Sequence, residues 1–487
     1  MILGKKNIFL ILVCFFSANF AFSQEQIGLK MSNYGGVNSI GINPAWSANG
    51  PYKWDLNIVS LGAFFDNDYL FVQKGSLLKF LLKSNSIIPN PAIKKPKGNI
   101  EKPVFYNYED RYKTYDLYQN LTLLGPAFMY NFPNHSVGIS YNIKEVFYLH
   151  EIAKDFGYYY FSDSATTKMV TGPLRTGVMT WGELGFNYAG VVMNNGLQEL
   201  TVGLTAKYLM GFDAVVGKSN EESVIVKIDE GVKLASGNVD LNYATNYAYD
   251  YEAEDWKYKL NRNGNGFGLD FGIAYTNKLT TVDQPHKFKI GVSILDVGRI
   301  KYFKNATTTK YVRNDTVTFM NDDFKEVRDI DLFIDKVGQI AYGDSNALRT
   351  GTTFTSWLPT ALSVQADFAV RENVYISAFG MMRMPRKGLG VDRENIIAVT
   401  PRYEKRKWEV GVPIVLYDFK RPRMGAYARL WNVTIGTDNF LSWFIPVPKW
   451  SGTDFYIGFK VNPKEEIDYL RSKKRGKAPK NFRCPKF

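Results

Sequence analysis

Several segments of the chain alternate strictly between large apolar residues and small or polar ones. From Phe267 to Tyr275, every second residue is large and apolar, and glycine, aspartate and alanine stand between them. The segments 200–212, 286–295 and 455–461 repeat this pattern. Successive residues of a strand point to opposite faces, so each segment predicts a strand with one apolar and one polar face. Runs of about 9 to 13 residues suit tilted strands that cross a membrane, and we predict an all-β fold, a transmembrane antiparallel β-barrel.

Composition excludes a helical membrane protein. No stretch after Gln24 reaches the roughly 18 apolar residues that a transmembrane helix needs, and the mean hydropathy is only -0.22. The chain is instead rich in glycine and aromatic residues, with 41 Gly, 31 Tyr and 34 Phe. Alternating strands also fit a soluble β-sandwich, in which the apolar faces of two sheets pack against each other. Segment length and the small or polar second face favour the barrel.

Residues 1–23 are typical of a secretory signal peptide. Two lysines precede an apolar run over 8–16, and Ala21-Phe22-Ser23 provides a small-residue cleavage site. Together with the strand pattern, this leader predicts export to the outer membrane of a Gram-negative bacterium. An exported chain meets little nucleic acid, so the net charge of +13 does not indicate nucleic-acid binding.

The mature chain divides into an N-terminal hatch segment over 24–51, a barrel over 52–462 and a basic periplasmic tail over 463–487 that carries Cys484, the one cysteine left after cleavage. Strand-like pieces at 223–228 and 239–249 form either a hairpin above the membrane or a further strand pair that would extend the barrel to 16 strands. Otherwise we predict about 14 strands, the even number that bacterial barrels prefer, near 52–63, 121–132, 136–149, 178–193, 198–212, 266–277, 286–297, 357–370, 373–382, 394–404, 407–417, 424–431, 432–438 and 453–462.

Short and long connections alternate between these segments. Three of the long ones are large, at 64–120, 213–265 and 298–356. Barrels of this class place short turns in the periplasm and long loops outside, so the alternation predicts both termini in the periplasm. We expect the large loops to fold over the mouth or into the lumen, and the amphipathic piece 324–340 to form a helix.

Two groups of residues resemble known outer-membrane proteins. The stretch 36–45, which ends in Asn43-Pro44-Ala45, resembles an early segment of FadL-like barrels. Residues 52–57, and 435–439 followed by 454–460, are similar to DUF5723, a family of Bacteroidetes outer-membrane barrels without established activity. The resemblance implies a 14-stranded barrel in which Asn43, Pro44 and Ala45 belong to a hatch. By fold analogy it also implies passage of hydrophobic molecules.

The sequence offers no catalytic set. None of the three histidines is paired with cysteine or a second histidine at metal-ligand spacing, and no glycine-rich phosphate loop precedes a helix. We therefore predict neither enzymatic activity nor a cofactor. Outer-membrane lipid and lipopolysaccharide, whose phosphates would pair with Lys and Arg of the outer loops, are the expected partners.

Polar residues on the inward faces are candidates for lining the lumen. They either select what passes or form ion pairs that plug a narrow pore, and we favour ion pairs. Two functions remain open. One is a channel or transporter for a small, hydrophobic molecule, and the other is a barrel that anchors a cell-envelope complex, as FadL-like barrels do in type IX secretion. The candidate lumen residues are Lys207, Asp270, Lys287, Lys289, Tyr456 and Lys460.

Overall fold

The computed structural model describes residues 25–83, 86–100, 102–162, 167–250, 252–278, 286–386 and 388–463. The predicted signal peptide over 1–23 lies outside these residues, as does all of the predicted tail except its first residue. Among the described residues, no helix is both long and apolar enough to cross a membrane.

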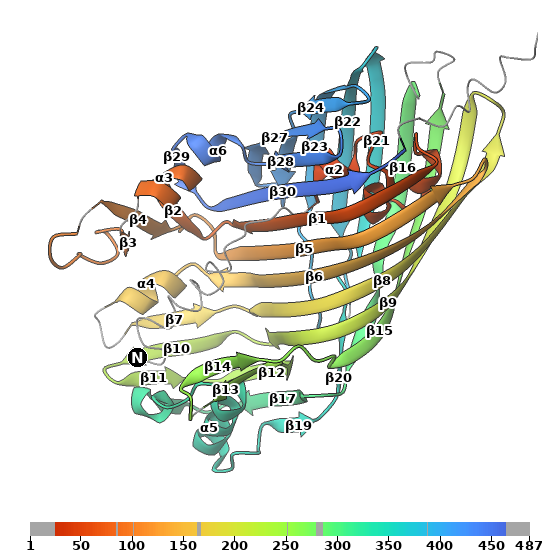
Figure 1. Ribbon diagram of the computed structural model, residues 1–487. Helices are drawn as coiled ribbons and strands as arrows, with labels where there is room; N and C mark the ends of the chain where they lie inside the picture. Colours follow the sequence, from red (N-terminus) through yellow and green to blue (C-terminus); the bar gives the residue numbers. More distant parts are fainter. Residues whose placement is uncertain are drawn as a thin grey trace, which may run out of the picture.

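The main sheet closes into an antiparallel barrel of 14 strands, as the sequence predicts (Figure 1). Closure occurs where the first strand, β1, pairs with the last strand, β30, on one side and with β5 on the other. In order around the barrel the strands are β1 (Trp54–Asn67), β5 (Thr114–Asn131), β6 (His135–Ala153), β8 (Arg175–Asn194), β9 (Gln198–Ser219), β15 (Gly264–Asn277), β16 (Phe288–Tyr302), β20 (Phe354–Trp357) continued by β21 (Ala361–Arg371), β22 (Val374–Arg383), β23 (Ile396–Glu404), β24 (Trp408–Gly411) with β25 (Ile414–Tyr417), β26 (Arg421–Met424) with β27 (Ala426–Leu430), β28 (Val433–Thr437) and β30 (Gly452–Val461).

The two faces of the strands differ as predicted. In β15, Phe267 and Phe271 are exposed on the outside, whereas Asp270, Ala274 and Thr276 are buried inside. The outer surface therefore offers apolar side chains to lipid, and the inner surface offers small and polar groups. This arrangement excludes the sandwich alternative, because the apolar faces do not pack against one another.

The wall of the barrel is uneven in height. On one side β8 has 20 residues and β9 has 22, whereas β23 has 9 and β28 has 5 on the other side. The long strands continue beyond the barrel, and there the outer part of β9 pairs with β12 (Gly237–Ala244). The predicted extension to 16 strands is wrong, because β12 continues the sheet beyond the 14-stranded ring, where it pairs with β9 and with β17 (Ala306–Arg313), and residues 223–228 lie in a separate four-stranded sheet.

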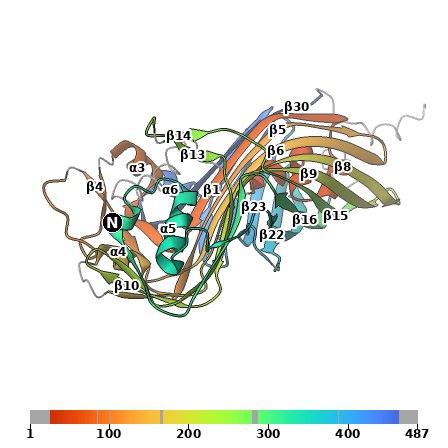
Figure 2. The same ribbon diagram turned by 90° about the horizontal axis from the view of Figure 1, so that it is seen from below.

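The long connections fold into small sheets and helices that gather at one end of the barrel, the long-loop end (Figure 2). The helix expected over 324–340 is α5, which begins after the cap residue Asp329 and ends before Gly343 in a left-handed conformation. The elements at this end are β2 (Leu70–Gly75), α3 (Leu77–Lys83), β3 (Ser86–Pro89), β4 (Pro103–Tyr108), α4 (Phe156–Phe161), β7 (Lys168–Thr171), β10 (Ser223–Ile228), β11 (Gly231–Leu234), β13 (Tyr247–Asp250), β14 (Asp255–Tyr258), β17 (Ala306–Arg313), β18 (Val317–Met320), η3 (Asn321–Phe324), α5 (Ile330–Tyr342), β19 (Arg349–Gly351), α6 (Leu441–Phe444) and β29 (Val447–Trp450).

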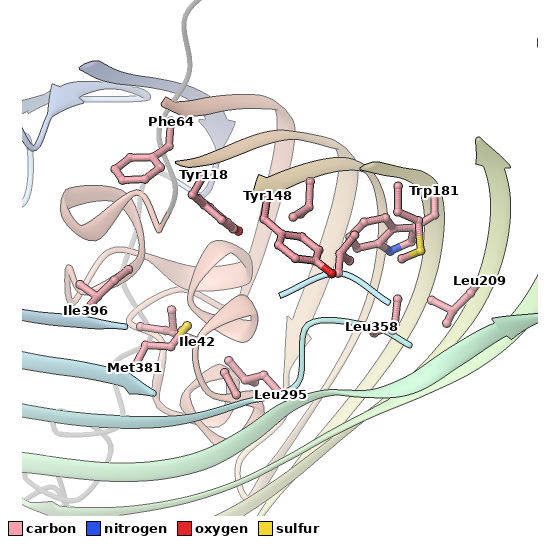
Figure 3. Packing of buried hydrophobic residues seen from close by; sticks show 14 of the residues in the cluster. Ile42, Phe64, Tyr118, Tyr148, Trp181, Leu209, Leu295, Leu358, Met381 and Ile396 are labelled. Carbon is pink, nitrogen blue, oxygen red and sulfur yellow. The ribbon is translucent and has the colours of Figure 1, made fainter. Parts of the chain in front are cut away.

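The N-terminal segment lies inside the barrel. Residues 25–50, which we call the plug, form α2 (Ile27–Lys30), η1 (Gly36–Gly41) and η2 (Pro44–Asn49). Figure 3 shows Ile42 of the plug among side chains that point inward from the wall, such as Leu295 and Met381. The core of the molecule is therefore the interior of the barrel, filled in part by the chain's own N-terminal segment.

Candidate functional site

One side of the plug rests on glycines of the wall. Gly203 of β9 and Gly272 of β15 are direct cross-strand partners. A Cβ added at Gly203 would lie well under 3.0 Å from backbone atoms of Pro44 and Ala45, and one added at Gly272 would meet Asn43 equally closely. Only glycine permits this approach of one backbone to another. We call Gly203, Gly272 and Gly291, which also approaches Asn43, the glycine seat.

Asn43 fixes the plug in this seat with both ends of its amide. Its Oδ1 accepts a hydrogen bond of 2.9 Å from the Ala45 N–H and so caps η2. Its Nδ2 donates to Gln365 Oε1 at 2.9 Å and to the Ile273 carbonyl at 3.2 Å. Gln365 in turn donates from Nε2 to the Ile42 carbonyl at 3.0 Å. The predicted hatch motif is thus held to the wall by neutral hydrogen bonds.

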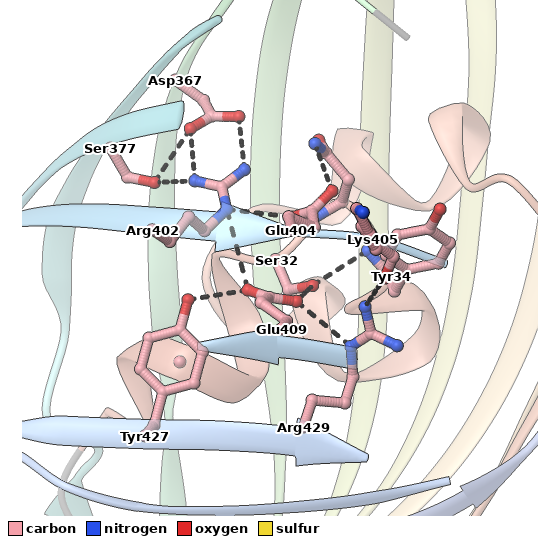
Figure 4. A network of polar contacts seen from close by, with 12 residues as sticks. Ser32, Tyr34, Asp367, Ser377, Arg402, Glu404, Lys405, Glu409, Tyr427 and Arg429 are labelled. Atoms are coloured by element: carbon pink, nitrogen blue, oxygen red, sulfur yellow. Dashed lines mark hydrogen bonds and ion pairs between the residues drawn. The ribbon is translucent and has the colours of Figure 1, made fainter. Parts of the chain in front are cut away.

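The neighbouring part of the wall presents buried charges to the plug, which we call the charged seat: Asp367, Arg402, Glu404, Glu409 and Arg429 (Figure 4). The Arg402 guanidinium binds Asp367 through two parallel contacts of 2.6 and 2.8 Å and Glu404 through Nε at 2.8 Å. Arg429 Nε lies 3.1 Å from Glu409. A bidentate pair of this kind holds the two side chains in a defined orientation and also strengthens their interaction.

The plug completes the hydrogen bonding of the charged seat. Three carboxylates face two guanidiniums there, so some carboxylate oxygens can still accept hydrogen bonds from other groups. Ser32 donates its hydroxyl to Glu409 at 2.7 Å, and Asn33 donates from Nδ2 to Glu404 at 2.8 Å. Without these donors, buried carboxylate oxygens would lose hydrogen bonds, which is costly in an environment of low dielectric.

The last strand also grips the plug. Lys460 of β30 binds Asp55 at 2.8 Å and donates to the backbone carbonyls of Gly35, at 3.0 Å, and Tyr34. Next to it, the Tyr456 hydroxyl accepts a hydrogen bond of 3.1 Å from the Gly28 N–H. Both side chains point inward, and their partners are the plug backbone and the first barrel strand.

A fourth contact of the plug is apolar. Val37 and Ile40 of η1 pack against Ala127 and Met129 of β5, with Leu124 beside them. We call this contact the apolar strip. It lies against the part of the wall where β5 contains the pair Gly125-Pro126.

The wall is irregular beside the apolar strip. The register of β5 against β6 shifts between Leu124 and Ala127, and that of β1 against β30 shifts between Asn57 and Val59. Proline has no N–H to offer the ladder. The Asn57 side chain spans the gap by donating to the carbonyls of Leu124 at 3.3 Å and Gly125 at 3.1 Å.

The lumen holds a connected set of ion pairs. Lys207 binds Asp270 at 2.7 Å and Asp296 at 2.5 Å. Arg393, from the loop between β22 and β23, binds Asp296 at 2.6 Å and Glu25 of the plug at 3.2 Å. These pairs tie plug, wall and loop together across the pore.

The structure brings most of the predicted lumen residues inside. Lys207, Asp270, Tyr456 and Lys460 are buried as described, and the buried Lys289 ammonium lies 4.1 Å from the centre of the Trp46 ring in the plug. Lys287 differs from the prediction. It is exposed, because it lies one residue before β16 begins, at the turn where the interior is not covered.

Sequence reasoning missed several residues of the interior. Arg402 and Glu404 lie two residues apart on the inward face of the predicted strand 394–404. Two charged residues at this spacing could have predicted a charged site in the lumen. Arg393 lies in a loop and has no such signal. Asp296 enters the lumen from a bulge of β16, where its φ of 53° is left-handed, and alternation alone does not reveal it.

Among the described residues, no group of three or more His, Cys, Asp or Glu is arranged to hold a metal ion. A family model described as "Family of unknown function (DUF5723)" matches residues 44–438. No curated protein matches the chain.

Several solved structures resemble the chain in fold alone. One is a deltaS2 mutant of the monoaromatic hydrocarbon channel TodX, with a TM-score of 0.39, 6% identity and coverage of 88% of this chain and 95% of that one. The toluene transporter TodX of P. putida gives 0.31 and 6%, with the same coverages of 88% and 95%. A Pseudomonas aeruginosa FadL homologue gives 0.24 and 9%, with coverages of 91% and 97%.

Proposed function

The chain belongs to DUF5723, a family of unknown function, and from this premise we propose that it is an outer-membrane channel for a small hydrophobic molecule, closed at rest by its plug. The observation that carries the proposal is the apolar strip beside the irregular wall. There an apolar solute can replace one apolar contact by another, whereas the two seats offer hydrogen bonds and charges that it cannot satisfy.

The lengths of the connections between strands indicate how the barrel is oriented in the membrane. The short turns face the periplasm and the long-loop end faces outward, as in bacterial barrels generally. Outer-membrane lipid covers the apolar belt, and lysines of the outer loops pair with lipopolysaccharide phosphates. A solute that enters from the long-loop end moves along Val37 and Ile40 and leaves where the ladder around Gly125-Pro126 is weakest.

A proline replacement tests this route. Pro126→Val supplies the missing N–H, and one added ladder hydrogen bond worth about 1 kcal/mol slows a local opening roughly fivefold. Pro401→Val is the matched control, because Pro401 is also an exposed proline of a barrel strand but lies in β23. The readout is entry of the fluorescent probe N-phenyl-1-naphthylamine into cells that carry each variant, with equal amounts of folded barrel verified by heat-modifiable gel mobility.

We expect entry above the level of cells without the protein, slower entry with Pro126→Val and unchanged entry with Pro401→Val. Equal rates for cells with and without the protein would reject the channel. Equal rates for the two variants would reject this exit route.

A second candidate function is supported by exposed apolar side chains at the long-loop end. Leu81 and Leu82 of α3 and Phe444 and Ile445 at α6 are each more than half exposed, and the two helices contact each other. Such a patch suits a barrel that anchors a cell-envelope complex such as a type IX secretion component. Mass spectrometry of the barrel purified in mild detergent separates the two functions. A stable protein partner without a bound small molecule would favour the anchor.

A further inference from the structure

A second polar site lies outside the plug contacts, at the long-loop end. A cavity of about 430 Å³ opens between the outer ends of β5, β6 and β8 and the segment that follows β22. Its lining is dominated by charged side chains, and three of them are arginines: Arg175, Arg383 and Arg386. Neither seat of the plug contributes to this lining.

Arg386 is the unusual residue of the cavity. Its side chain is only 9% exposed, and its Nη1 binds Asp392 at 2.8 Å and the Val391 carbonyl. Its Nε and Nη2 are buried and contact no carboxylate within the described part of the chain, and the Tyr148 hydroxyl lies beside the guanidinium. Buried guanidinium donors without acceptors are costly. The Nε and Nη2 groups of Arg386 are therefore available to donate hydrogen bonds to an anion.

Two of the three carboxylates in the lining have other partners, and the third, Glu151, makes no ion pair with Arg386 among the described residues. Asp392 is shared, because it also lies 3.5 Å from Arg175 and 3.7 Å from His150. Asp116 is taken by His150 Nδ1 at 3.0 Å. Burial lowers the pKa of Arg386 below its usual value, Asp392 opposes this shift, and the two other arginines add to it.

Arg383 adds a third guanidinium to a lining that also carries the carboxylates of Asp116, Glu151 and Asp392. A guanidinium can only donate, so its contact of 3.0 Å with His150 makes Nε2 of that ring an acceptor and leaves Arg383 without neutralisation by the ring. We propose that this cavity binds a small solute through an oxyanion, a carboxylate or a phosphate, held by the free edge of Arg386. This binding site is independent of the hydrophobic route along the plug.

Calorimetric titration of the purified full barrel tests the site with two probes in separate arms, succinate for the carboxylate and inorganic phosphate for the phosphate. Sodium chloride at equal ionic strength controls for screening. We expect saturable binding of at least one probe, weakened roughly tenfold or more by Arg386→Gln, since a charge-assisted hydrogen bond contributes about 1.5–3 kcal/mol. The control Arg371→Gln, an exposed arginine at the short-turn end, leaves binding unchanged.

Protection from phenylglyoxal provides a readout that needs no variant. The better-binding probe should slow modification of Arg386 in the unaltered protein, measured by peptide mass spectrometry, and should leave Arg371 unprotected. Absence of saturable binding for both probes, or equal binding by the protein and Arg386→Gln, would overturn the proposal. Neither result bears on entry of the hydrophobic probe, so the two proposals fail separately.

Discussion

The two seats of the plug hold the same segment by opposite means. In the charged seat, large side chains reach inward and Arg402, Glu404 and Glu409 bind one another as well as the plug. In the glycine seat the wall offers no side chain at Gly203 and Gly272, and the plug fills the space with its backbone at Gly203 and with the Asn43 side chain at Gly272. The charged seat is therefore damaged by removing atoms, and the glycine seat by adding them.

This difference also separates the roles of the two seats. Hydrogen bonds to buried carboxylates depend on direction and tolerate little displacement, because a buried charged acceptor without its donor is costly. Close packing on glycine depends mainly on shape, with the neutral hydrogen bonds of Asn43 beside it, and is lost more gradually when the plug moves away. A plug that shifts should leave the glycine seat and the apolar strip before it leaves the charged seat.

The largest effect is expected from Arg402→Met. This change leaves Asp367, Glu404 and Glu409 buried without their shared guanidinium, and loss of one partner of a buried pair costs about 3–5 kcal/mol. Urea unfolding of the barrel in detergent measures the loss. Arg371→Met, at an exposed position, should change the free energy of unfolding by less than about 0.5 kcal/mol. Similar values for both variants would remove the distinction between the seats.

A smaller effect is expected from Gly272→Ala. The added methyl group collides with Asn43, and overpacking typically costs about 1–3 kcal/mol. Gly380→Ala is the matched control, because a Cβ on that barrel glycine meets nothing within 4 Å. Limited proteolysis should cut the plug faster in Gly272→Ala than in the control. Equal cutting would mean that the glycine seat does not hold the plug.

Ile40→Val trims the apolar strip by one methylene group, and we expect a loss of about 1 kcal/mol in the free energy of unfolding. The same urea titration measures it. A loss larger than that of Gly272→Ala would show that the strip, and not the glycine seat, contributes more to plug seating.

The smallest effect is expected from Leu81→Ser, outside both seats. Leu81 is 66% exposed on α3, so its replacement should change the free energy of unfolding by less than about 0.5 kcal/mol. Thermal unfolding is the check. A clear loss of stability would mean that the exposed helices pack against the barrel more than their exposure indicates.

The barrel was predictable from sequence because alternation is a local property. Phe267 and Asp270 carry the two faces of β15 within four residues, and the 14 segments follow from such patterns. The plug contacts are not local. Lys460 and the Gly35 carbonyl are 425 residues apart, and the sequence around either residue does not predict that the two are in contact. The bulge at Asp296 and the exposed position of Lys287 likewise depend on where a strand bends or begins.

The grip of Lys460 on the plug has a consequence for assembly. β30 is the final strand of the described part of the chain, and the barrel closes when it pairs with β1. If β30 paired with β1 before the plug entered the lumen, the Lys460 ammonium would be buried without the Tyr34 and Gly35 carbonyls that accept its hydrogen bonds in the folded protein. We therefore expect the N-terminal segment to enter the barrel before β30 pairs with β1. Earlier closure would be unfavourable, because the buried Lys460 ammonium would lack hydrogen-bond acceptors.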